Sequence, residues 1–380
     1  MKTAFIACAL LLAATPAFAQ FGSAMGKINK AADQAQKVKD LQISDADERK
    51  IGEAVSAHII DEFGVYQDKD VAKYVTLVGT VLAQASSRPN LNWEFIVLDT
   101  DAVNAFASPG GIIHVTRGVL GLAKTEAELA GILGHEITHV TEKHTTNSIQ
   151  KSKAVSFTAD QVGKGGLTQD LIAQFSEKAY HAILNNQFDR GDENEADHIG
   201  VQLANKVGYD PSGLTKVLTK IEERNKDQKE PNGMFASHPV VADRIQKINK
   251  AIADGKLTAT AVVSARYTKA ITFDAKPISA LATVPEGSRG LTGGSESAAK
   301  KDDDKDDKKD EKKDEKKKGG LFGSGLSLSK GSETKSSQTV ASAGARGITP
   351  DRDAVGGANK TKIPVKLTPA EITQFKSGIA

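Results

Sequence analysis

Two histidines stand four residues apart in the segment GILGHEITHVTEKH, which spans residues 131–144. On a helix His135 and His139 share one face, so their ring nitrogens can bind one metal ion between them. Glu136 lies about 100° further around the helix, where its carboxylate can reach a water on that ion. The spacing therefore predicts two metal ligands and a general base. The alternative is a solvated polar face, but the apolar neighbours indicate a buried helix whose polar groups need partners.

A third metal ligand has to come from elsewhere in the chain. His144 lies five residues beyond the second histidine and is expected to turn away from the ligand face, which favours a hydrogen-bonded structural role. In the segment ENEADHIG, Glu193 is the candidate third ligand. Asp197, one turn further on a stripe with two small residues, can accept the Nδ1 hydrogen of a liganding histidine. Glu195 and His198 point elsewhere and are expected to be surface residues. Two imidazoles and one carboxylate suit one zinc ion with an open position.

The N-terminus has the pattern of a secretory signal peptide. The segment MKTAFIACALLLAATPAFAQ contains a lysine, an apolar stretch, a proline and the triplet Ala-Phe-Ala before Gln20. We therefore expect residues 1–19 to be cleaved and the mature protein to be periplasmic. A lipoprotein signal that uses Cys8 is less favoured because the apolar stretch before it is short. Cys8 is the only cysteine, so a metal site in the mature chain must use His, Asp and Glu.

Helical periodicity dominates the chain between residues 44 and 265. Ser44 is the expected N-cap of one helix, and Thr125 with Glu128 forms a capping box ahead of the helix that carries the histidines. Few strands are expected, and one of them is Ile112–Thr116, whose side chains alternate between two faces. The predicted fold class is α+β, a mainly helical domain with a small β-sheet.

The composition changes after the helical part of the chain. The stretch 300–318 contains ten lysines and nine acidic residues without any apolar residue. Such a stretch cannot bury a core, so it predicts a disordered linker that continues into a Gly/Ser-rich segment. The predicted organisation is a signal peptide at 1–19, an N-terminal linker or helix at 20–43, the domain with the predicted zinc site at 44–265, an uncertain extension at 266–299, a disordered linker at 300–365 and a short amphipathic segment at 366–380.

The last segment has the signals of a short helix. Thr368 is the expected N-cap, Pro369 occupies the first helical position and Glu371 completes a capping box. Phe375 and Ile379 lie on a narrow apolar stripe. Because so short a helix is marginally stable alone, it should form only when this stripe docks. The partner is either the same chain's domain or another envelope protein, and a frayed tail is the alternative.

Composition also excludes some classes of function. The formal net charge of +2 indicates no charged partner, and no aromatic-basic pattern suggests nucleic acid. After the signal peptide, no stretch is apolar over the roughly 18 residues that a membrane span needs. We therefore expect a soluble protein or one associated peripherally with the membrane, and the sequence does not define its oligomeric state.

The motifs GHEITHVTEKH, ENEADHIG, GYDP and SHPVVADR, preceded by NAFASPGGIIHVTRG, follow one another in this order. From about residue 44 to about 250 the chain resembles the zinc peptidases of the HtpX, BepA and LoiP type, which are gluzincins of metallopeptidase family forty-eight. The resemblance implies one zinc ion on His135, His139 and Glu193, with Glu136 as base and Asp197 as orienting acid. The chain lacks the membrane helices of HtpX and the helical repeat of BepA, so their membrane-protein turnover and repeat-mediated docking do not carry over.

The resemblance also implies roles for a loop and a strand. It puts the loop of His238 beside the metal, where this histidine could stabilise the oxyanion or block the open zinc position. A histidine facing water is the alternative. Arg244, six residues further, could hold this loop or an acidic neighbour. The strand Ile112–Thr116 would be the edge strand lining the cleft, where an extended substrate pairs main chain to main chain. An ordinary core strand is the alternative.

Together these features predict a zinc metalloendopeptidase of the cell envelope. It would hydrolyse peptide bonds through a zinc-bound water activated by Glu136. Its expected partners are unfolded or misassembled envelope polypeptides as substrates. The alternative is a chaperone-like module that keeps the fold and the zinc but hydrolyses little. The intact Glu136 favours the enzyme because a binding module needs no base.

Overall fold

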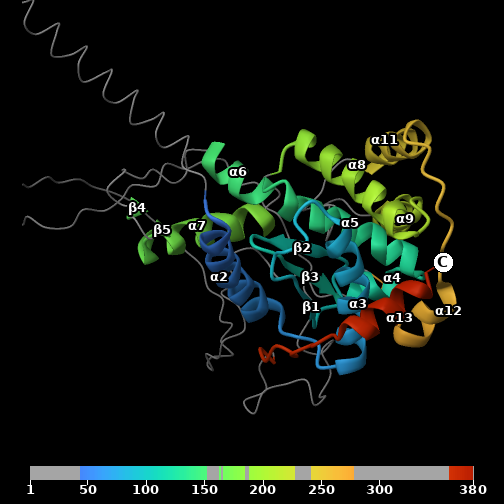
Figure 1. The fold of residues 1–380 in the computed structure, drawn as a ribbon, viewed down its shortest axis with the longest axis horizontal. Coiled ribbons are helices and arrows are strands. Elements are labelled where there is room, and N and C mark those ends of the chain that lie inside the picture. Colours follow the sequence, from blue (N-terminus) through green and yellow to red (C-terminus); the bar gives the residue numbers. More distant parts are fainter. Residues whose placement is uncertain are drawn as a thin grey trace, which may run out of the picture.

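The structure is a computed structural model that describes residues 43–151, 162–163, 166–184, 188–226, 241–277 and 359–379. The helices are α2 (Asp45–Phe63), α3 (Lys69–Ala85), α4 (Arg117–Leu122), α5 (Glu126–Thr141), α6 (His144–Lys151), α7 (Gln169–Leu184), α8 (Arg190–Val207), α9 (Gly213–Asn225), α11 (Val241–Asp254), α12 (Ser264–Ala270) and α13 (Pro369–Ser377). The strands are β1 (Glu94–Leu98), β2 (Ala105–Ser108), β3 (Ile112–Thr116), β4 (Val162–Gly163) and β5 (Gly166–Leu167). The predicted mainly helical α+β class is confirmed (Figure 1).

Parts of the predicted organisation lie outside the described residues. These parts include the signal peptide and almost all of the N-terminal linker, and also most of the extension and of the charged linker. Among the helices that the structure describes, none combines the length and the apolar character needed to cross a membrane.

A three-stranded sheet forms the centre of the fold, in the order β1-β3-β2. β3 pairs in parallel with β1 and antiparallel with β2. Helices α3 and α5 cover one face of this sheet, and α2 and α7 cover the other (Figure 1). Ile113 and Val115 join the core on the α5 side, whereas Ile112 joins the core on the α2 side. The two faces thus follow the alternation of side chains along a strand.

The prediction that Ile112–Thr116 is the edge strand is wrong. β3 has a partner strand on each side, so it is the central strand. The edge position beside α5 belongs to β2, which reaches β3 through a turn containing Gly110 and Gly111, both at positive φ. The alternative given above, an ordinary core strand, is what the structure shows. The edge position came from the family resemblance, and the alternation of side chains within one strand does not reveal how many neighbouring strands it has.

Two glycines let α5 and α8 touch at their backbones. A Cβ atom on Gly134 would lie 2.8 Å from the carbonyl oxygen of Gly200, and one on Gly200 would lie 2.8 Å from the amide nitrogen of His135. Close-packed interiors leave no room for such an atom without separating the helices. The stripe of small residues predicted on α8 therefore makes the expected close contact, and it brings α8 beside the histidines.

Side-chain caps begin the two helices in the predicted places. The hydroxyl of Ser44 accepts a hydrogen bond from the Asp47 amide, and that of Thr125 accepts one from the Glu128 amide. In the predicted capping box the Glu128 side chain would accept a hydrogen bond from the amide of Thr125, and the structure differs in this bond. Glu128 Oε2 accepts from the amide of Lys124 at 2.7 Å, one residue before the N-cap. The helix start is unaffected, because the carboxylate still binds a main-chain donor in front of the first turn.

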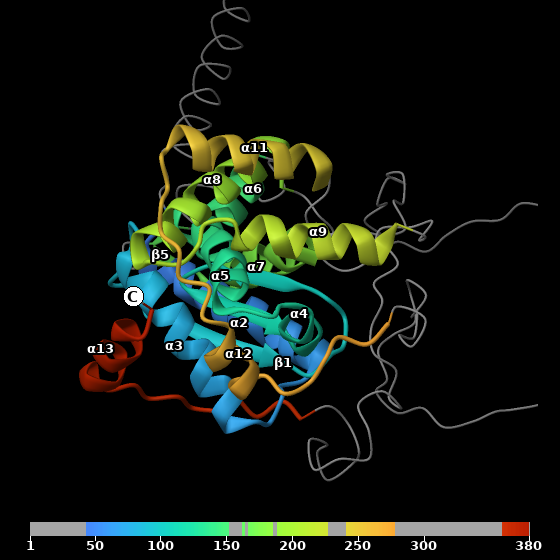
Figure 2. The same cartoon turned by 90° about the vertical axis from the view of Figure 1, so that its right-hand side faces the viewer.

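The C-terminal helix α13 docks on the same chain. Thr368 and Glu371 form the predicted capping box, with Pro369 at the first turn. Phe375 and Ile379 are 8% and 2% exposed and belong to the core cluster that includes α3. Figure 2 shows α13 against α3, and Arg266 of α12 contacts Phe375 of α13. The sequence left open whether this helix docks on its own domain or on another protein. In the described residues it docks on its own domain.

An extended segment leads into α13, and we call residues 359–379 the C-terminal arm. The carbonyl oxygen of Asn359 accepts from the Val65 amide at 2.6 Å. Lys362 Nζ lies 3.1 Å from Glu94 Oε1 at the start of β1. Residues 359–365, which the sequence assigned to the linker, therefore already contact the domain. The connecting residues 278–358 join two segments that both lie on it.

Candidate metal centre

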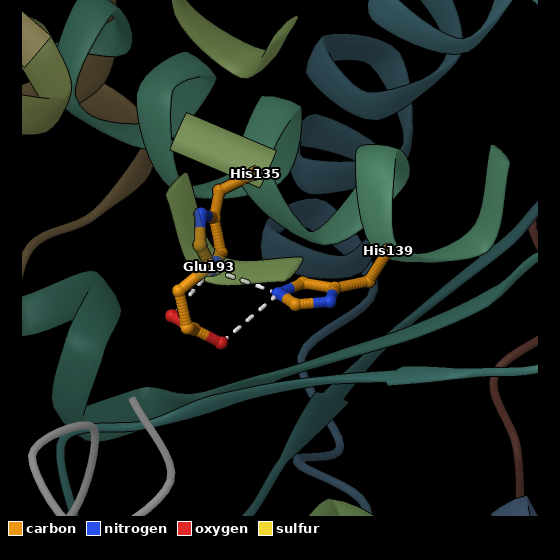
Figure 3. A group of neighbouring side chains, drawn as sticks. All are labelled: His135, His139 and Glu193. Atoms are coloured by element: carbon orange, nitrogen blue, oxygen red, sulfur yellow. Dashed lines mark hydrogen bonds and ion pairs between the residues drawn. The ribbon is translucent and has the colours of Figure 1, made fainter. Parts of the chain in front are cut away.

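The candidate metal centre is built on α5 and α8. α5 supplies His135, Glu136 and His139, which are 0%, 1% and 1% exposed, and the start of α8 supplies Glu193, which is 3% exposed. One ligand atom from each of the two histidines and Glu193 lies within 4.8 Å of the other two (Figure 3). The three ligands proposed from the sequence are thus brought together by the fold.

The distances between these ligand atoms suit a zinc ion. His139 Nε2 lies 3.0 Å from His135 Nε2 and 3.5 Å from Glu193 Oε1. Glu193 Oε2 lies 3.7 Å from His135 Nε2. Tetrahedral ligands at about 2.0–2.2 Å from zinc are roughly 3.3–3.6 Å apart, so the observed separations bracket one face of such a tetrahedron. Two imidazoles and one carboxylate are also the donor set of known catalytic zinc sites.

Asp197 holds the ring of His135. Its Oδ1 lies 3.0 Å from His135 Nδ1, which assigns the hydrogen to Nδ1 and turns the lone pair of Nε2 towards the centre. Burial alone would raise the pKa of the Asp197 carboxyl. The charge and hydrogen bonds of Arg244, with the contact to His135, outweigh burial and hold this pKa below its ordinary value. Asp197 therefore stays ionised and accepts from the ring.

Arg244 of α11 neutralises the acidic groups behind the centre. Its Nε and Nη2 donate to the two oxygens of Asp197 at 2.8 and 2.7 Å, and its Nη1 lies 3.2 Å from Glu193 Oε2. Burial would lower the pKa of Arg244, but the charges of Asp197, Glu193 and Glu136 raise it. The sequence left open whether Arg244 holds a loop or an acidic neighbour, and the structure shows two acidic neighbours.

His144 contacts the centre from the other side. It is 2% exposed, and its Nδ1 lies 2.9 Å from Nδ1 of His139. Its Nε2 lies 3.2 Å from Glu195 Oε2, although Glu195 is half exposed as predicted. The sequence reasoning extended α5 through residue 144, which would point this histidine away. Instead α5 ends at Thr141, and the turn at Lys143, with φ 57°, redirects His144 towards His139.

Sequence reasoning missed one neighbour of the centre and placed another beyond the described residues. The ring of Phe188 lies 4.5 Å from the ring of His139. The signal that could have located it is its place directly before Asp189, the N-cap of α8. His238 lies outside the described residues, so its role stays a prediction. His198 is exposed, as predicted, and lies 3.0 Å from the side-chain nitrogen of Gln202.

A buried helix with the HExxH spacing, a carboxylate from a second helix and an aspartate behind one histidine define a metallohydrolase-type centre. Residues 70–252 match peptidase family M48, so this part of the chain is similar to the peptidase domains of that family. Helices α5, α8 and α9, the three-stranded sheet and almost all of α3 and α11 fall within this match.

Several curated proteins are similar to the chain. The beta-barrel assembly-enhancing protease of Escherichia coli is 24% identical over 56% of this chain and 47% of its own length. The metalloprotease LoiP of Escherichia coli is 28% identical over 58% of this chain and 85% of its own length. The mitochondrial metalloendopeptidase OMA1 of Schizosaccharomyces pombe is 30% identical over 47% of this chain and 52% of its own length. The chain thus spans less than half the length of the first of these relatives.

Proposed function

We propose that the protein is a zinc-dependent endopeptidase of the cell envelope that acts on misfolded or misassembled proteins. The observation that carries this proposal is the buried cluster of His135, His139 and Glu193 beside Glu136. These three residues would hold one zinc ion per chain. A zinc ion at such a site polarises a peptide carbonyl and lowers the pKa of water. The names of the similar proteins, all proteases, support the same reaction class.

Glu136 is the proposed general base. It follows His135 directly on α5 and is 1% exposed, so its carboxylate works where bulk water does not compete. In the proposed reaction Glu136 takes a proton from the attacking water and later delivers it to the leaving amine. It is not a ligand, so replacing it should leave metal binding intact.

Asp197 and Arg244 are proposed to orient the centre rather than to react. Asp197 fixes the tautomer of His135, and Arg244 fixes Asp197 through two hydrogen bonds. The oxyanion needs a further donor, and His238 remains the residue that the family resemblance suggests for it.

β2 is the proposed substrate-pairing strand in place of the strand named from the sequence. It is the edge strand of the sheet on the side of α5. Its Ala105 and Ala107 belong to the same core cluster as the apolar residues of α5. An extended peptide that pairs with this edge is recognised through its main chain, which suits unfolded substrates of varied sequence.

The proposed location is the periplasm. It rests on the signal-peptide pattern of residues 1–19. The name of one similar protein, a beta-barrel assembly-enhancing protease, agrees with substrates that are envelope proteins in the course of assembly. The part of the chain that the structure describes has no membrane-spanning helix, and peripheral association with the membrane remains part of the proposal.

Digestion of unfolded casein by the purified, zinc-loaded chain tests the proposal. We expect cleavage that a zinc chelator abolishes and that Glu136→Gln abolishes while zinc stays bound. If wild type and Glu136→Gln degrade casein equally slowly and both suppress its aggregation, the chaperone-like alternative replaces the enzyme. If the enzyme is confirmed, capture of proteins from the envelope fraction by the inactive Glu136→Gln variant would identify its substrates.

A further inference from the structure

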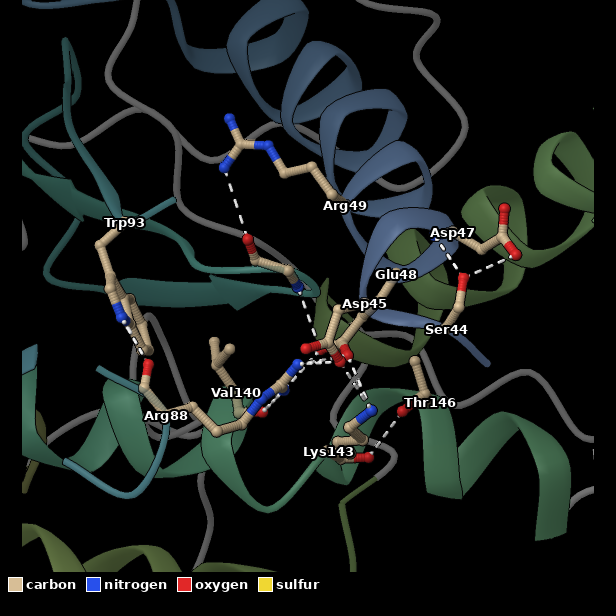
Figure 4. Close-up of polar contacts among 11 residues, drawn as sticks. Ser44, Asp45, Asp47, Glu48, Arg49, Arg88, Trp93, Val140, Lys143 and Thr146 are labelled. Carbon is tan, nitrogen blue, oxygen red and sulfur yellow. Dashed lines mark hydrogen bonds and ion pairs between the residues drawn. The ribbon is translucent and has the colours of Figure 1, made fainter. Parts of the chain in front are cut away.

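A further buried carboxylate lies near the metal centre, on α2. Glu48 is 1% exposed and receives donors from three other segments (Figure 4). Arg88 donates to its two oxygens at 3.0 and 2.9 Å, the Gly110 amide donates at 3.1 Å, and Lys143 Nζ lies at 3.1 Å. A buried charge needs such partners, and removing one partner of a buried pair is costly. Glu48 is therefore held firmly in place.

The donors come from the segments that border the metal centre. Gly110 lies in the turn between β2 and β3. Arg88 also donates to the carbonyl oxygen of Val140 at 2.9 Å, directly after His139. Lys143 lies in the turn between α5 and α6, in a left-handed conformation that is unfavourable for residues other than glycine. One narrow crevice beside the metal centre, too small to hold a water molecule, is bordered by Glu48, Pro109, His139 and Lys143.

Main-chain contacts fix the β2–β3 turn on α2. A Cβ atom on Gly52 would lie 1.8 Å from the Pro109 carbonyl oxygen, and one on Gly110 would lie 2.5 Å from the Cα atom of Arg49. The turn therefore rests directly on the α2 backbone, one helical turn from Glu48. Glu48 also binds Arg88, and Arg88 binds the end of α5. These contacts therefore set the distance between the edge strand β2 and the helix α5, which carries the two histidines.

We propose that Glu48 is a positioning residue for peptide hydrolysis. It holds the end of β2 and the end of α5 in one arrangement, so that a peptide paired with β2 presents its carbonyl group at the metal centre. The inference rests on the proposed function of β2 and the metal centre. Glu48 acts through Gly110 and Arg88 and not by contact with the substrate.

This role predicts a particular kinetic signature. β2 stays paired with β3 when Glu48 is changed, so the peptide should still bind. A displacement of about 1 Å between bound peptide and catalytic groups can reduce the rate by about 100-fold. The loss should therefore appear in kcat, with little change in KM or in zinc content.

The test compares Glu48→Gln with Asp45→Asn in the full, zinc-loaded chain. Glutamine keeps the shape of Glu48 but loses the charge that holds Arg88 and Lys143. Asp45 is the matched control, because it contacts the same Arg88 and Lys143 nitrogens at 2.8 and 3.4 Å while its side chain is 67% exposed. With an extended fluorogenic peptide, we expect a fall in kcat of about 10- to 100-fold for Glu48→Gln. Asp45→Asn should keep wild-type kinetics.

Hydrogen exchange provides a measurement that does not depend on turnover. The amides of residues 105–108, 110 and 111 should exchange faster in Glu48→Gln than in wild type or Asp45→Asn, because the Gly110 amide loses its charged acceptor. Arg88→Lys is the second variant in case Glu48→Gln does not fold. A lysine cannot bridge Glu48 and Val140 together, so kcat should fall again.

Defined results would overturn the inference. Wild-type kcat in Glu48→Gln, or a loss that lies in KM or in zinc content alone, removes the positioning role. If kcat falls equally in Asp45→Asn, the effect comes from the loss of surface charge and not from the positioning of β2 and α5. If wild type itself hydrolyses no peptide, the proposed function fails first and this inference falls with it.

Discussion

Replacing Phe375 with alanine tests whether the C-terminal arm is part of the folded domain. Phe375 is 8% exposed and packs edge-on against Tyr74, with ring centroids 6.2 Å apart. The guanidinium of Arg266 lies 4.0 Å from the centre of its ring. Arg266 also donates to the Phe375 carbonyl oxygen at 3.1 Å and pairs with Glu126, the first residue of α5. The phenylalanine ring is therefore one anchor of the arm, together with Ile379.

The structure sets the size of the expected effect. Truncating a core phenylalanine to alanine costs about 3–5 kcal/mol of unfolding free energy. Phe375 lies at the margin of the core, and its short helix can undock instead of leaving a cavity. We therefore expect the lower end, about 3 kcal/mol, which includes about 0.5–1 kcal/mol from the lost cation–π contact. For a domain of this size the melting temperature falls by about 2–4 °C per kcal/mol, or about 6–12 °C here.

Calorimetry of the zinc-loaded full chain measures this shift. Gln374→Ala is the matched control, because Gln374 is exposed on the same helix and its replacement should leave the melting temperature within about 1 °C. A melting temperature for Phe375→Ala equal to that of Gln374→Ala would refute the reasoning. It would mean that the arm is not docked in solution, and that the frayed tail considered from the sequence is the correct description.

Three further predictions concern the metal centre and the core. Glu193→Ala should lose zinc measured by metal analysis, and full zinc content in this variant would remove Glu193 from the ligand set. Asp197→Asn should weaken zinc affinity by about 10- to 100-fold in a chelator competition, and unchanged affinity would contradict its orienting role. Burial lowers the pKa of His114 to about 3, so the folded state binds fewer protons there than the unfolded state does. Stability should therefore fall as the pH drops below about 6.5, by about 2 kcal/mol at pH 5. Urea unfolding should show a smaller acid loss for His114→Gln, and equal losses would contradict this cause.

The parts of the site that were predictable from the sequence are those fixed by local geometry. Helical spacing alone puts His135 and His139 on one face, and it puts Glu193 and Asp197 on one stripe. The glycines that allow α5 and α8 to touch are likewise visible as small residues at the right spacing. These inferences hold because a helix fixes the relative directions of its own side chains, whatever it packs against.

The parts that were not predictable depend on contacts between distant segments or on where a helix stops. The neighbours of β3 follow from the whole sheet, so its pattern of residues could not identify it as the central strand. His144 reaches His139 because the chain turns at Lys143, a residue with no sequence signal for a positive φ. Glu48 lies 91 positions before His139 in the sequence, and only the fold reveals that both line one crevice.

The charges around the metal centre give an independent reason to expect a divalent cation. Glu136, Glu193 and Asp197 are three buried carboxylates, and Arg244 is the buried cation that pairs with two of them. Arg244 balances one of the three negative charges. A divalent ion with neutral histidine ligands would balance the other two, so the centre would become neutral when one ion binds. Because two unbalanced buried charges are costly, the balance favours an ion of charge two at this position.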